Sequence, residues 1–154
     1  IMVPAPNTSH QTISGILEFE LRKFIEKHAI GKIFDAPIDV ILSETNVVQP
    51  DILFITNENS EIITNKNIDG APELIIEILS PSTGYYDLIE KKEIYEKFGV
   101  QEYWILDPKK QWVEIYVNVQ NKFKLHQRAE KKGILKSSIL DGFQISLEKI
   151  FETE

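Results

Sequence analysis

The stretch ELIIEILSPST, residues 73–83, contains an apolar run of the kind found in a strand buried on both faces. Glu77 interrupts that run. An ionised carboxylate is costly in such a place unless a cation or hydrogen-bond donors pair with it. The run therefore predicts an internal strand of a sheet, and Glu77 is the first candidate for a functional side chain.

The composition is typical of one globular domain. The 154 residues are 42% hydrophobic and include 2 Trp, 8 Phe and 5 Tyr, which argues against a disordered chain. Cysteine is absent, which excludes disulfides, thiolate metal sites and a cysteine nucleophile. No apolar stretch approaches the roughly 18 residues of a membrane-spanning helix, and the start IMVPAP has no basic signal-peptide region. We therefore expect a single cytoplasmic domain over residues 1–154, from which a short first segment is missing.

The rest of the chain alternates between helical and strand-like patterns. Apolar residues recur at helical spacing over residues 9–28, for which Thr8 or Ser9 is available as the N-cap. Asp87 predicts the start of a second helix over residues 88–98. Strand-like runs lie at residues 36–42, 50–56, 73–79, 102–108, 112–119, 122–127 and 143–147. The expected fold is α/β or α+β, with helices on the faces of a sheet and a β-hairpin toward the C-terminus.

A second carboxylate joins Glu77 if two of these strands are neighbours. Asp51 opens the run QPDILFIT, on the face that also holds Leu53 and Ile55. Two hard oxygen ligands from adjacent strands, completed by a backbone carbonyl and water molecules, suit Mg²⁺ or Mn²⁺. The alternative is that Asp51 only opens a turn after Pro50, and that Glu77 lies half-exposed on an edge strand.

The expected second helix carries a lysine on its apolar side. At about 100° per residue, Lys91 falls in the middle of the stripe formed by Leu88, Ile94, Tyr95 and Phe98. A lysine in that position commonly extends its ammonium group along apolar surface to the solvent. Here it also points inward from the element that directly follows Glu77. A buried ammonium group prefers an anion, so Asp51, Glu77 and Lys91 together form a candidate site.

The first expected helix carries two fainter candidates. Glu20 lies inside its apolar stripe, and His10 faces the same side. In a functional site, Glu20 would hydrogen-bond a metal-bound water, and His10 would contact a phosphate or a carboxylate. For each residue the alternative is a polar side chain that is satisfied within the fold or lies at a frayed helix end.

Charge is distributed unevenly along the chain. The net charge of −7 speaks against a polyanionic partner, but residues 1–77 carry all of this excess, with 5 basic and 12 acidic side chains. Residues 109–136 carry a net positive charge, because this segment contains eight basic side chains and only two acidic ones, Glu114 and Glu130. This segment is either a solvated hairpin whose lysines discourage edge-to-edge aggregation or a surface that contacts phosphates.

Several blocks of the sequence resemble one known family. GAPELIIEILSPST and DLIEKKEIYEKFGVQEYWILDP are similar to the Uma-type endonucleases, a bacterial family in the PD-(D/E)xK nuclease superfamily. SHQTI, VVQPDILFI and SSILDGFQISLEKIF resemble the other blocks of that family in the same order, so the resemblance covers essentially the whole chain. The family generally has an additional segment before the first helix. The resemblance implies a restriction-endonuclease-like core, in which helices flank a mixed sheet.

The resemblance also implies a site. It places the acidic pair of the family on Asp51 and Glu77. The superfamily pattern has a lysine two residues after the glutamate, where this chain has Leu79. The family instead uses a lysine of the following helix, and Lys91 holds the matching position. Asp51, Glu77 and the carbonyl of Ile78 would bind Mg²⁺, and Lys91 would orient the attacking water or stabilise developing charge.

The resulting hypothesis is metal-dependent hydrolysis of phosphodiester bonds, with DNA as the partner and Mg²⁺ or Mn²⁺ as the cofactor. Cleavage of both strands would favour a homodimer. The phosphates beside the cleaved bond would be held by Lys109, Lys110, Lys122, Lys124 and Arg128. Two alternatives stay open. One is a non-catalytic module that keeps the nuclease fold and binds nucleic acid or protein, and the other is a sugar hydrolase that pairs Asp51 with Glu77 and stacks sugars on Trp104 or Trp112.

Overall fold

The computed structural model describes residues 7–81 and 83–152 of the chain, so the expectation of a missing first segment lies outside the described residues. In this part of the chain, no helix is both long and apolar enough to cross a membrane. In chain order the elements are α1 (Thr8–His28), β1 (Gly31–Asp35), β2 (Val40–Ser43), β3 (Asn46–Val48), β4 (Ile52–Thr56), the 3-10 helix η1 (Asn57–Ile62), β5 (Leu74–Ile78), α2 (Tyr85–Lys97), β6 (Glu102–Asp107), β7 (Trp112–Val119), β8 (Lys122–Glu130), β9 (Ile134–Lys136), β10 (Gln144–Ser146) and α3 (Leu147–Ile150).

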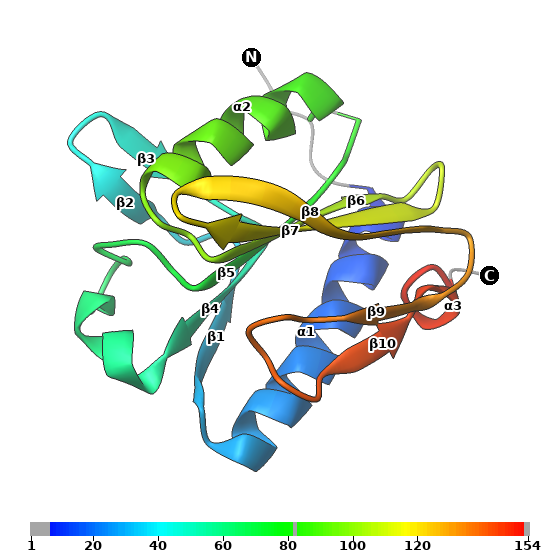
Figure 1. The fold of residues 1–154 in the computed structure, drawn as a ribbon, viewed down its shortest axis with the longest axis horizontal. Helices are drawn as coiled ribbons and strands as arrows, with labels where there is room; N and C mark the ends of the chain where they lie inside the picture. Colours follow the sequence, from blue (N-terminus) through cyan, green and yellow to red (C-terminus); the bar gives the residue numbers. More distant parts are fainter. Residues whose placement is uncertain (1–6, 82, 153–154) are drawn as a thin grey trace.

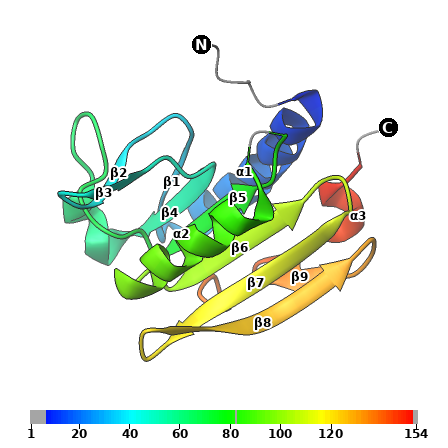
Figure 2. The same cartoon turned by 90° about the horizontal axis from the view of Figure 1, so that it is seen from above.

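The main sheet is mixed. Among the described residues it has six strands in the order β1-β4-β5-β6-β7-β8, in which β5 and β6 pair in parallel and the other neighbours pair antiparallel. A parallel pair needs a crossover connection, and α2 lies within it. In Figure 1, α2 lies above the sheet, whereas α1 and the β9–β10 hairpin lie below it. Figure 2 shows α2 lying over β5 and β6. The predicted mixed sheet flanked by helices is confirmed, and the β-hairpin predicted toward the C-terminus is the β7–β8 pair at the edge of this sheet.

Each face of the sheet packs against its own helix, because successive side chains of a strand point to opposite faces. In β5, Leu74 and Ile76 pack in the core that contains the apolar stripe of α1, whereas Ile75 packs in the core beneath α2. Glu77 follows the same alternation and faces α2. All five residues of β5 are buried, and the strand has a neighbour on each side. The predicted internal strand is therefore confirmed, and the edge-strand alternative for Glu77 is wrong.

Helix α1 begins one residue earlier than predicted. Its N-cap is Asn7, whose side-chain oxygen accepts the backbone N–H of His10 at 2.9 Å. The prediction of Thr8 or Ser9 as the cap is therefore wrong. Asparagine caps helices at least as well as serine or threonine, so residue type alone did not separate the three positions.

The predicted strand over residues 36–42 is wrong in its first half. Strand β1 ends at Asp35, and β2 begins only at Val40. Pro37 lies between them and has no N–H to donate to a strand ladder, so the chain leaves the sheet there.

Helix α2 also starts earlier than predicted, at Tyr85 and not at residue 88. Asp87 therefore lies inside the first turn and is not the N-cap. From that position its carboxylate accepts the backbone N–H of Gly84 at 3.2 Å. An acidic side chain in the first turn also complements the positive end of the helix dipole, which explains why Asp87 indicates a helix start in the sequence.

Candidate active site

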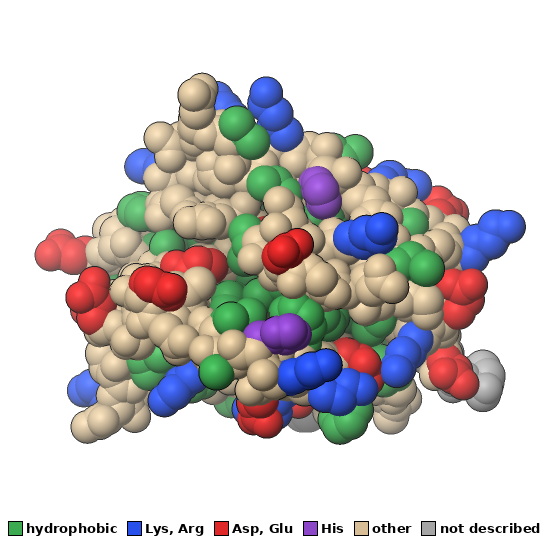
Figure 3. Space-filling view, turned by 60° about the horizontal axis from the view of Figure 1, so that its bottom comes forward, with side chains coloured by type: hydrophobic (Ala, Val, Ile, Leu, Met, Phe, Trp, Pro, Cys, Tyr) green, Lys and Arg blue, Asp and Glu red, His purple; other side chains and the backbone are tan. Residues whose placement is uncertain are grey.

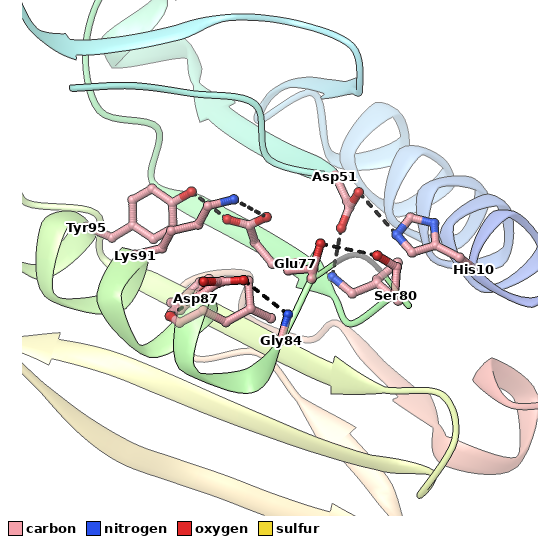
Figure 4. A network of polar contacts seen from close by, with 12 residues as sticks. His10, Asp51, Glu77, Ser80, Gly84, Asp87, Lys91 and Tyr95 are labelled. Carbon is pink, nitrogen blue, oxygen red and sulfur yellow. Dashed lines mark hydrogen bonds and ion pairs between the residues drawn. The ribbon is translucent and has the colours of Figure 1, made fainter. Parts of the chain in front are cut away.

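Strand pairing brings Asp51 and Glu77 together. Strands β4 and β5 pair antiparallel with Ile52 opposite Ile76, so the same register continued by one residue sets Asp51 opposite Glu77. Asp51 Oδ2 accepts the backbone N–H of Ile78 at 2.7 Å, which ties the start of β4 to the end of β5. In Figure 4, Glu77 lies between Asp51 on one side and α2 on the other.

Helix α2 holds Glu77 through two donors. Lys91 Nζ lies 3.3 Å from Glu77 Oε1, and the hydroxyl of Tyr95 donates to Glu77 Oε2 at 2.6 Å. Lys91 and Tyr95 are four residues apart, so they lie on the same face of the helix. The contact agrees with the inward direction predicted for Lys91 from the helical spacing. Tyr95 was predicted only as part of the apolar stripe, although its spacing from Lys91 is a signal that could have identified it.

Burial dominates the electrostatics of Glu77. The side chain is only 5% exposed, and the loss of hydration raises its pKa from the ordinary value of 4.5 to about 7. The ammonium group of Lys91 and the hydroxyl of Tyr95 favour the charged form and limit this rise, whereas the charge of Asp51 adds to it. A carboxyl group with a pKa near neutrality, beside a second carboxylate and an ammonium group, is typical of a catalytic site.

Helix α1 contributes His10 to the same group. His10 Nε2 lies 3.3 Å from Asp51 Oδ1, so both carboxylate oxygens of Asp51 have a partner. This contact is one of the two that the sequence predicted for His10. His10 is buried, whereas the side chain of Asp51 is 19% exposed and lines a cavity of about 280 Å³ between α1 and the end of β1. Asp51 is therefore the member of the carboxylate pair that solvent reaches directly.

The structure does not bring Glu20 to this group. Its carboxylate lies 3.2 Å from Lys23 Nζ and 3.1 Å from Lys149 Nζ. Burial by itself would raise the pKa of Glu20, but the hydrogen bonds from Lys149 and Lys23 lower it. Glu20 thus joins α1 to α3, and its inward position on the helix is explained by a lysine from the far end of the chain.

Asp51, Glu77 and the carbonyl of Ile78 are oxygen donors of the kind that Mg²⁺ and Mn²⁺ prefer. The N–H of Ile78 points to Asp51, and in an extended strand the carbonyl of the same residue points to the same side. Within residues 7–81 and 83–152, no three His, Asp or Glu side chains lie close enough to hold a metal ion by themselves. An ion here would therefore need water molecules as further ligands. Mg²⁺ usually keeps several waters, so this donor set fits it.

The five basic candidates do not form one surface. Lys109 and Lys110 precede β7, whereas Lys122 and Lys124 open β8 at the far end of the β7–β8 hairpin. An eight-residue strand such as β7 spans about 25 Å, and this length separates the two pairs. On the face drawn in Figure 3, lysine and arginine side chains are scattered among acidic ones.

Arg128 is engaged in contacts within the fold. Its Nε lies 3.4 Å from Glu114 Oε2 and its Nη1 lies 3.3 Å from Glu130 Oε1. The guanidinium group also lies over the ring of Trp112, 5.4 Å from the centroid. A phosphate would have to compete with these partners for Arg128.

A cavity of about 560 Å³ opens where the parallel strands β5 and β6 end. Leu79 and Ser80, which follow β5, line it together with Tyr85 at the start of α2. Lys109, which follows β6, lines it as well, so this basic candidate lies on the same side as the carboxylate pair. Ligands of open α/β sheets bind beyond the carboxyl ends of the parallel strands, and this cavity has that position.

The two tryptophans are placed unfavourably for sugar stacking. Trp104 is fully buried, and its indole N–H donates to Glu102 at 2.7 Å. Trp112 is also buried, with the ring of Tyr85 edge-on at 5.8 Å and Arg128 over its face. Neither ring presents an open face to solvent, so the sugar-hydrolase alternative has no support from the aromatic residues on which it depended.

Comparison with known proteins agrees with the resemblance seen in the sequence. The fold is similar to the crystal structure of "a putative nuclease belonging to DUF820" from Anabaena variabilis ATCC 29413, with a TM-score of 0.80 and 21% sequence identity over 99% of this chain and 85% of that chain. At this identity the likeness shows the fold alone. A search among curated proteins finds no match. Residues 1–148 match the Uma2 family, described as "Putative restriction endonuclease", and the chain therefore belongs to that family.

Proposed function

We propose that this protein is a metal-dependent endonuclease that hydrolyses phosphodiester bonds in DNA, with Mg²⁺ or Mn²⁺ as its cofactor. The observation that carries the proposal is the convergence of three groups from separate elements. Asp51 precedes β4, Glu77 lies in β5 and Lys91 lies in α2, yet Lys91 lies 3.3 Å from Glu77 and Asp51 accepts the backbone N–H of Ile78, the residue next to Glu77, at 2.7 Å. Membership of a family of restriction-endonuclease-like nucleases supports the same class of reaction.

The carboxylate pair and the carbonyl of Ile78 would hold the ion. When bound, Mg²⁺ supplies a water of lowered pKa and neutralises charge on the scissile phosphate. Burial makes the ionised form of Glu77 costly, so a cation beside the carboxylate would stabilise that form. His10 would keep Asp51 in place through its 3.3 Å contact.

Lys91 would act on the substrate. Its side chain is 30% exposed while its ammonium group lies 3.3 Å from Glu77, so the group reaches both the carboxylate and the solvent. From this position it would orient the attacking water or stabilise negative charge that develops on the phosphate. The superfamily pattern has a lysine on the strand at the position where this chain has Leu79. Lys91, from the crossover helix α2, would take over the role of that lysine.

The substrate would approach over the ends of β5 and β6. Lys109 lines the cavity there, and Lys110 follows it, so these two are the basic candidates best placed to contact phosphates beside the cleaved bond. Lys122, Lys124 and Arg128 would contact DNA only if it extended along the β7–β8 hairpin. Such contacts would make binding weaker as salt rises.

Cleavage of supercoiled plasmid, single-stranded DNA and RNA with Mg²⁺ or Mn²⁺ tests the proposal. We expect Asp51→Asn, Glu77→Gln and Lys91→Met each to lower the cleavage rate by about 10²-fold or more, since each removes a group from the site. Glu73→Gln and Lys92→Met are matched controls. Glu73 lies just before β5 and binds the backbone of Thr56, and Lys92 lies over the ring of Tyr116; neither touches the site.

The controls should cleave within about threefold of the wild type, because neither residue touches the site. A threefold change in rate corresponds to less than about 1 kcal/mol of activation free energy. Equal cleavage by all the variants would indicate a contaminating nuclease and would remove the proposal. Binding of DNA without cleavage under any metal condition would support the non-catalytic module instead. Sedimentation of the protein with and without duplex DNA would test the homodimer that cleavage of both strands favours.

A further inference from the structure

The two partners of Glu77 on α2 differ in kind. Lys91 makes the longer contact, at 3.3 Å, and its side chain is 30% exposed. Tyr95 makes the shorter contact, at 2.6 Å, and is fully buried. When the ammonium group of Lys91 turns toward a phosphate or a water, Glu77 keeps the hydrogen bond from Tyr95. The tyrosine is therefore the fixed partner and the lysine the exchangeable one.

The core between α2 and the sheet fixes Tyr95 in turn. Its ring packs edge-on against the ring of Tyr103, with the centroids 5.0 Å apart and the planes at 72°. The hydroxyl of Tyr103 donates to the carbonyl of Leu88 at 3.2 Å, which ties β6 to the first half of α2. Burial, together with the charge of Glu77, raises the pKa of Tyr95 well above its ordinary value, so the hydroxyl remains a donor.

We propose that Tyr95 is a positioning residue whose hydroxyl holds the Glu77 carboxylate in the orientation that receives the cation, which leaves Lys91 free for the substrate. This inference rests on the proposed function, because it assigns Glu77 to the metal. Tyr95 touches neither the substrate nor the ion and acts only through Glu77. Partners of this kind typically change metal affinity by about 10–100-fold when they are removed.

Tyr95→Phe tests the role, and Tyr103→Phe is its matched control. Both substitutions remove one buried hydroxyl and keep the ring, but only Tyr95 donates to Glu77. We expect Tyr95→Phe to weaken Mn²⁺ binding by about tenfold in calorimetric titration. It should also lower kcat and leave the KM for DNA within about twofold of the wild type, since no phosphate contact is lost. Tyr103→Phe should lower the melting temperature by about as much as Tyr95→Phe does, because each loses one buried hydroxyl. It should leave Mn²⁺ affinity unchanged.

A second measurement uses the wild-type chain and does not depend on whether a variant folds. The ¹³Cζ resonance of tyrosine reports hydrogen bonding of the hydroxyl. During a Mg²⁺ titration, we expect the Tyr95 resonance to shift with saturation and the Tyr103 resonance to stay within the linewidth. In Glu77→Gln the same titration should leave both resonances in place.

The outcomes separate this inference from the proposed function. Unchanged Mn²⁺ affinity in Tyr95→Phe, or an equal loss in Tyr103→Phe, would overturn the role of Tyr95 whether or not the protein cleaves DNA. A chain that binds Mn²⁺ with the expected dependence on Tyr95, yet cleaves nothing, would support the positioning role and remove the nuclease. A wild-type chain that binds no divalent ion would overturn both.

Discussion

Glu77 and Glu102 are two buried carboxylates on the parallel strands β5 and β6, and their surroundings differ. Glu77 has one hydroxyl and one ammonium group as partners. Glu102 instead accepts four hydrogen bonds from neutral donors, which are the indole of Trp104 (2.7 Å), the hydroxyl of Ser137 (2.8 Å) and the backbone N–H groups of Ser138 (2.8 Å) and Ile139 (3.1 Å).

The difference separates a carboxylate that serves the fold from one that is a candidate for function. The donors of Glu102 are part of the fold and have no second task, so this carboxylate fastens residues 137–139, and with them the β9–β10 hairpin, to the sheet. Of the two donors of Glu77, Lys91 can leave for another anion, and the pKa of Glu77 is about 7. A buried carboxylate is therefore a stronger functional candidate when one of its partners is an exchangeable cation than when neutral donors saturate it.

The largest effect on stability is expected at the saturated carboxylate. Glu102→Leu leaves four donors without their acceptor, and each hydrogen bond to a charged group contributes about 1 kcal/mol or more. We expect the free energy of unfolding, measured in urea, to fall by about 4 kcal/mol. Mn²⁺ affinity below the melting temperature should stay at the wild-type value. A loss of stability under about 1 kcal/mol would contradict the structural role of Glu102.

Glu77→Gln, unlike Glu102→Leu, should raise the free energy of unfolding relative to the wild type as the pH increases. Because the pKa of Glu77 is about 7 in the folded chain and 4.5 ordinarily, the folded state binds this proton more tightly than the unfolded state. Wild-type stability therefore falls as pH rises from about 4.5 to about 7, and glutamine removes this loss. In metal-free buffer, the stability of the variant relative to wild type should grow by about 3 kcal/mol between pH 4.5 and 8. Urea unfolding across this range measures it, and a constant difference would show that burial does not raise the pKa of Glu77.

A divalent ion should change the free energy of unfolding through Glu77 and not through Glu102, and this effect should be slightly smaller than the pH effect. An ion that binds only the folded chain stabilises it by about 2.7 kcal/mol at a hundredfold excess over its Kd. We expect Mn²⁺ to raise the free energy of unfolding of the wild type by this amount at pH 7.5 and to leave Glu77→Gln unchanged. Stabilisation of equal size in both proteins would place the ion elsewhere.

The smallest effect is expected from a single donor to Glu102. Ser137→Ala removes one of the four hydrogen bonds to Glu102 and also the acceptor of the Leu140 N–H, so the free energy of unfolding should fall by about 2 kcal/mol. The cleavage rate should be unchanged. Thermal unfolding measures the first and the plasmid assay the second, and a change in the cleavage rate would connect Glu102 to the active site.

The sequence predicted Glu77 and Lys91 because each contradicts its own local pattern. A carboxylate in an apolar run and an ammonium group in an apolar stripe are visible without any partner. Glu102 gave no such signal, because it lies at the start of its strand beside the polar Gln101, and three of its four partners are 35 or more residues away. Tyr95 matched the apolar pattern of α2, so only its hydroxyl and its spacing of four residues from Lys91 distinguished it from the rest of the core.

Long-range packing also explains why other candidates do not lie at the site. The inward position of Glu20 was read correctly, but its partner Lys149 comes from the far end of the chain. Lys109 and Lys110 belong to the same basic segment as Lys122 and Lys124, and the β7–β8 hairpin separates the two pairs by the length of a strand. Spacing along the chain predicts faces of helices and strands well, and it does not predict which elements meet.

The position of the lysine on α2, and not on β5, ties its chemistry to helical phase. Inserting one residue within α2, between Tyr85 and Lys91, would turn the ammonium group by about 100° around the helix axis relative to the start of the helix and shift it by about 1.5 Å. A lysine two residues after the glutamate on the same strand would lie on the same face as the glutamate, because side chains alternate between the two faces of a strand. In this protein, by contrast, the proposed activity would depend on the number of residues between the start of α2 and Lys91, so insertions there should be far less tolerated than in the loop before β5.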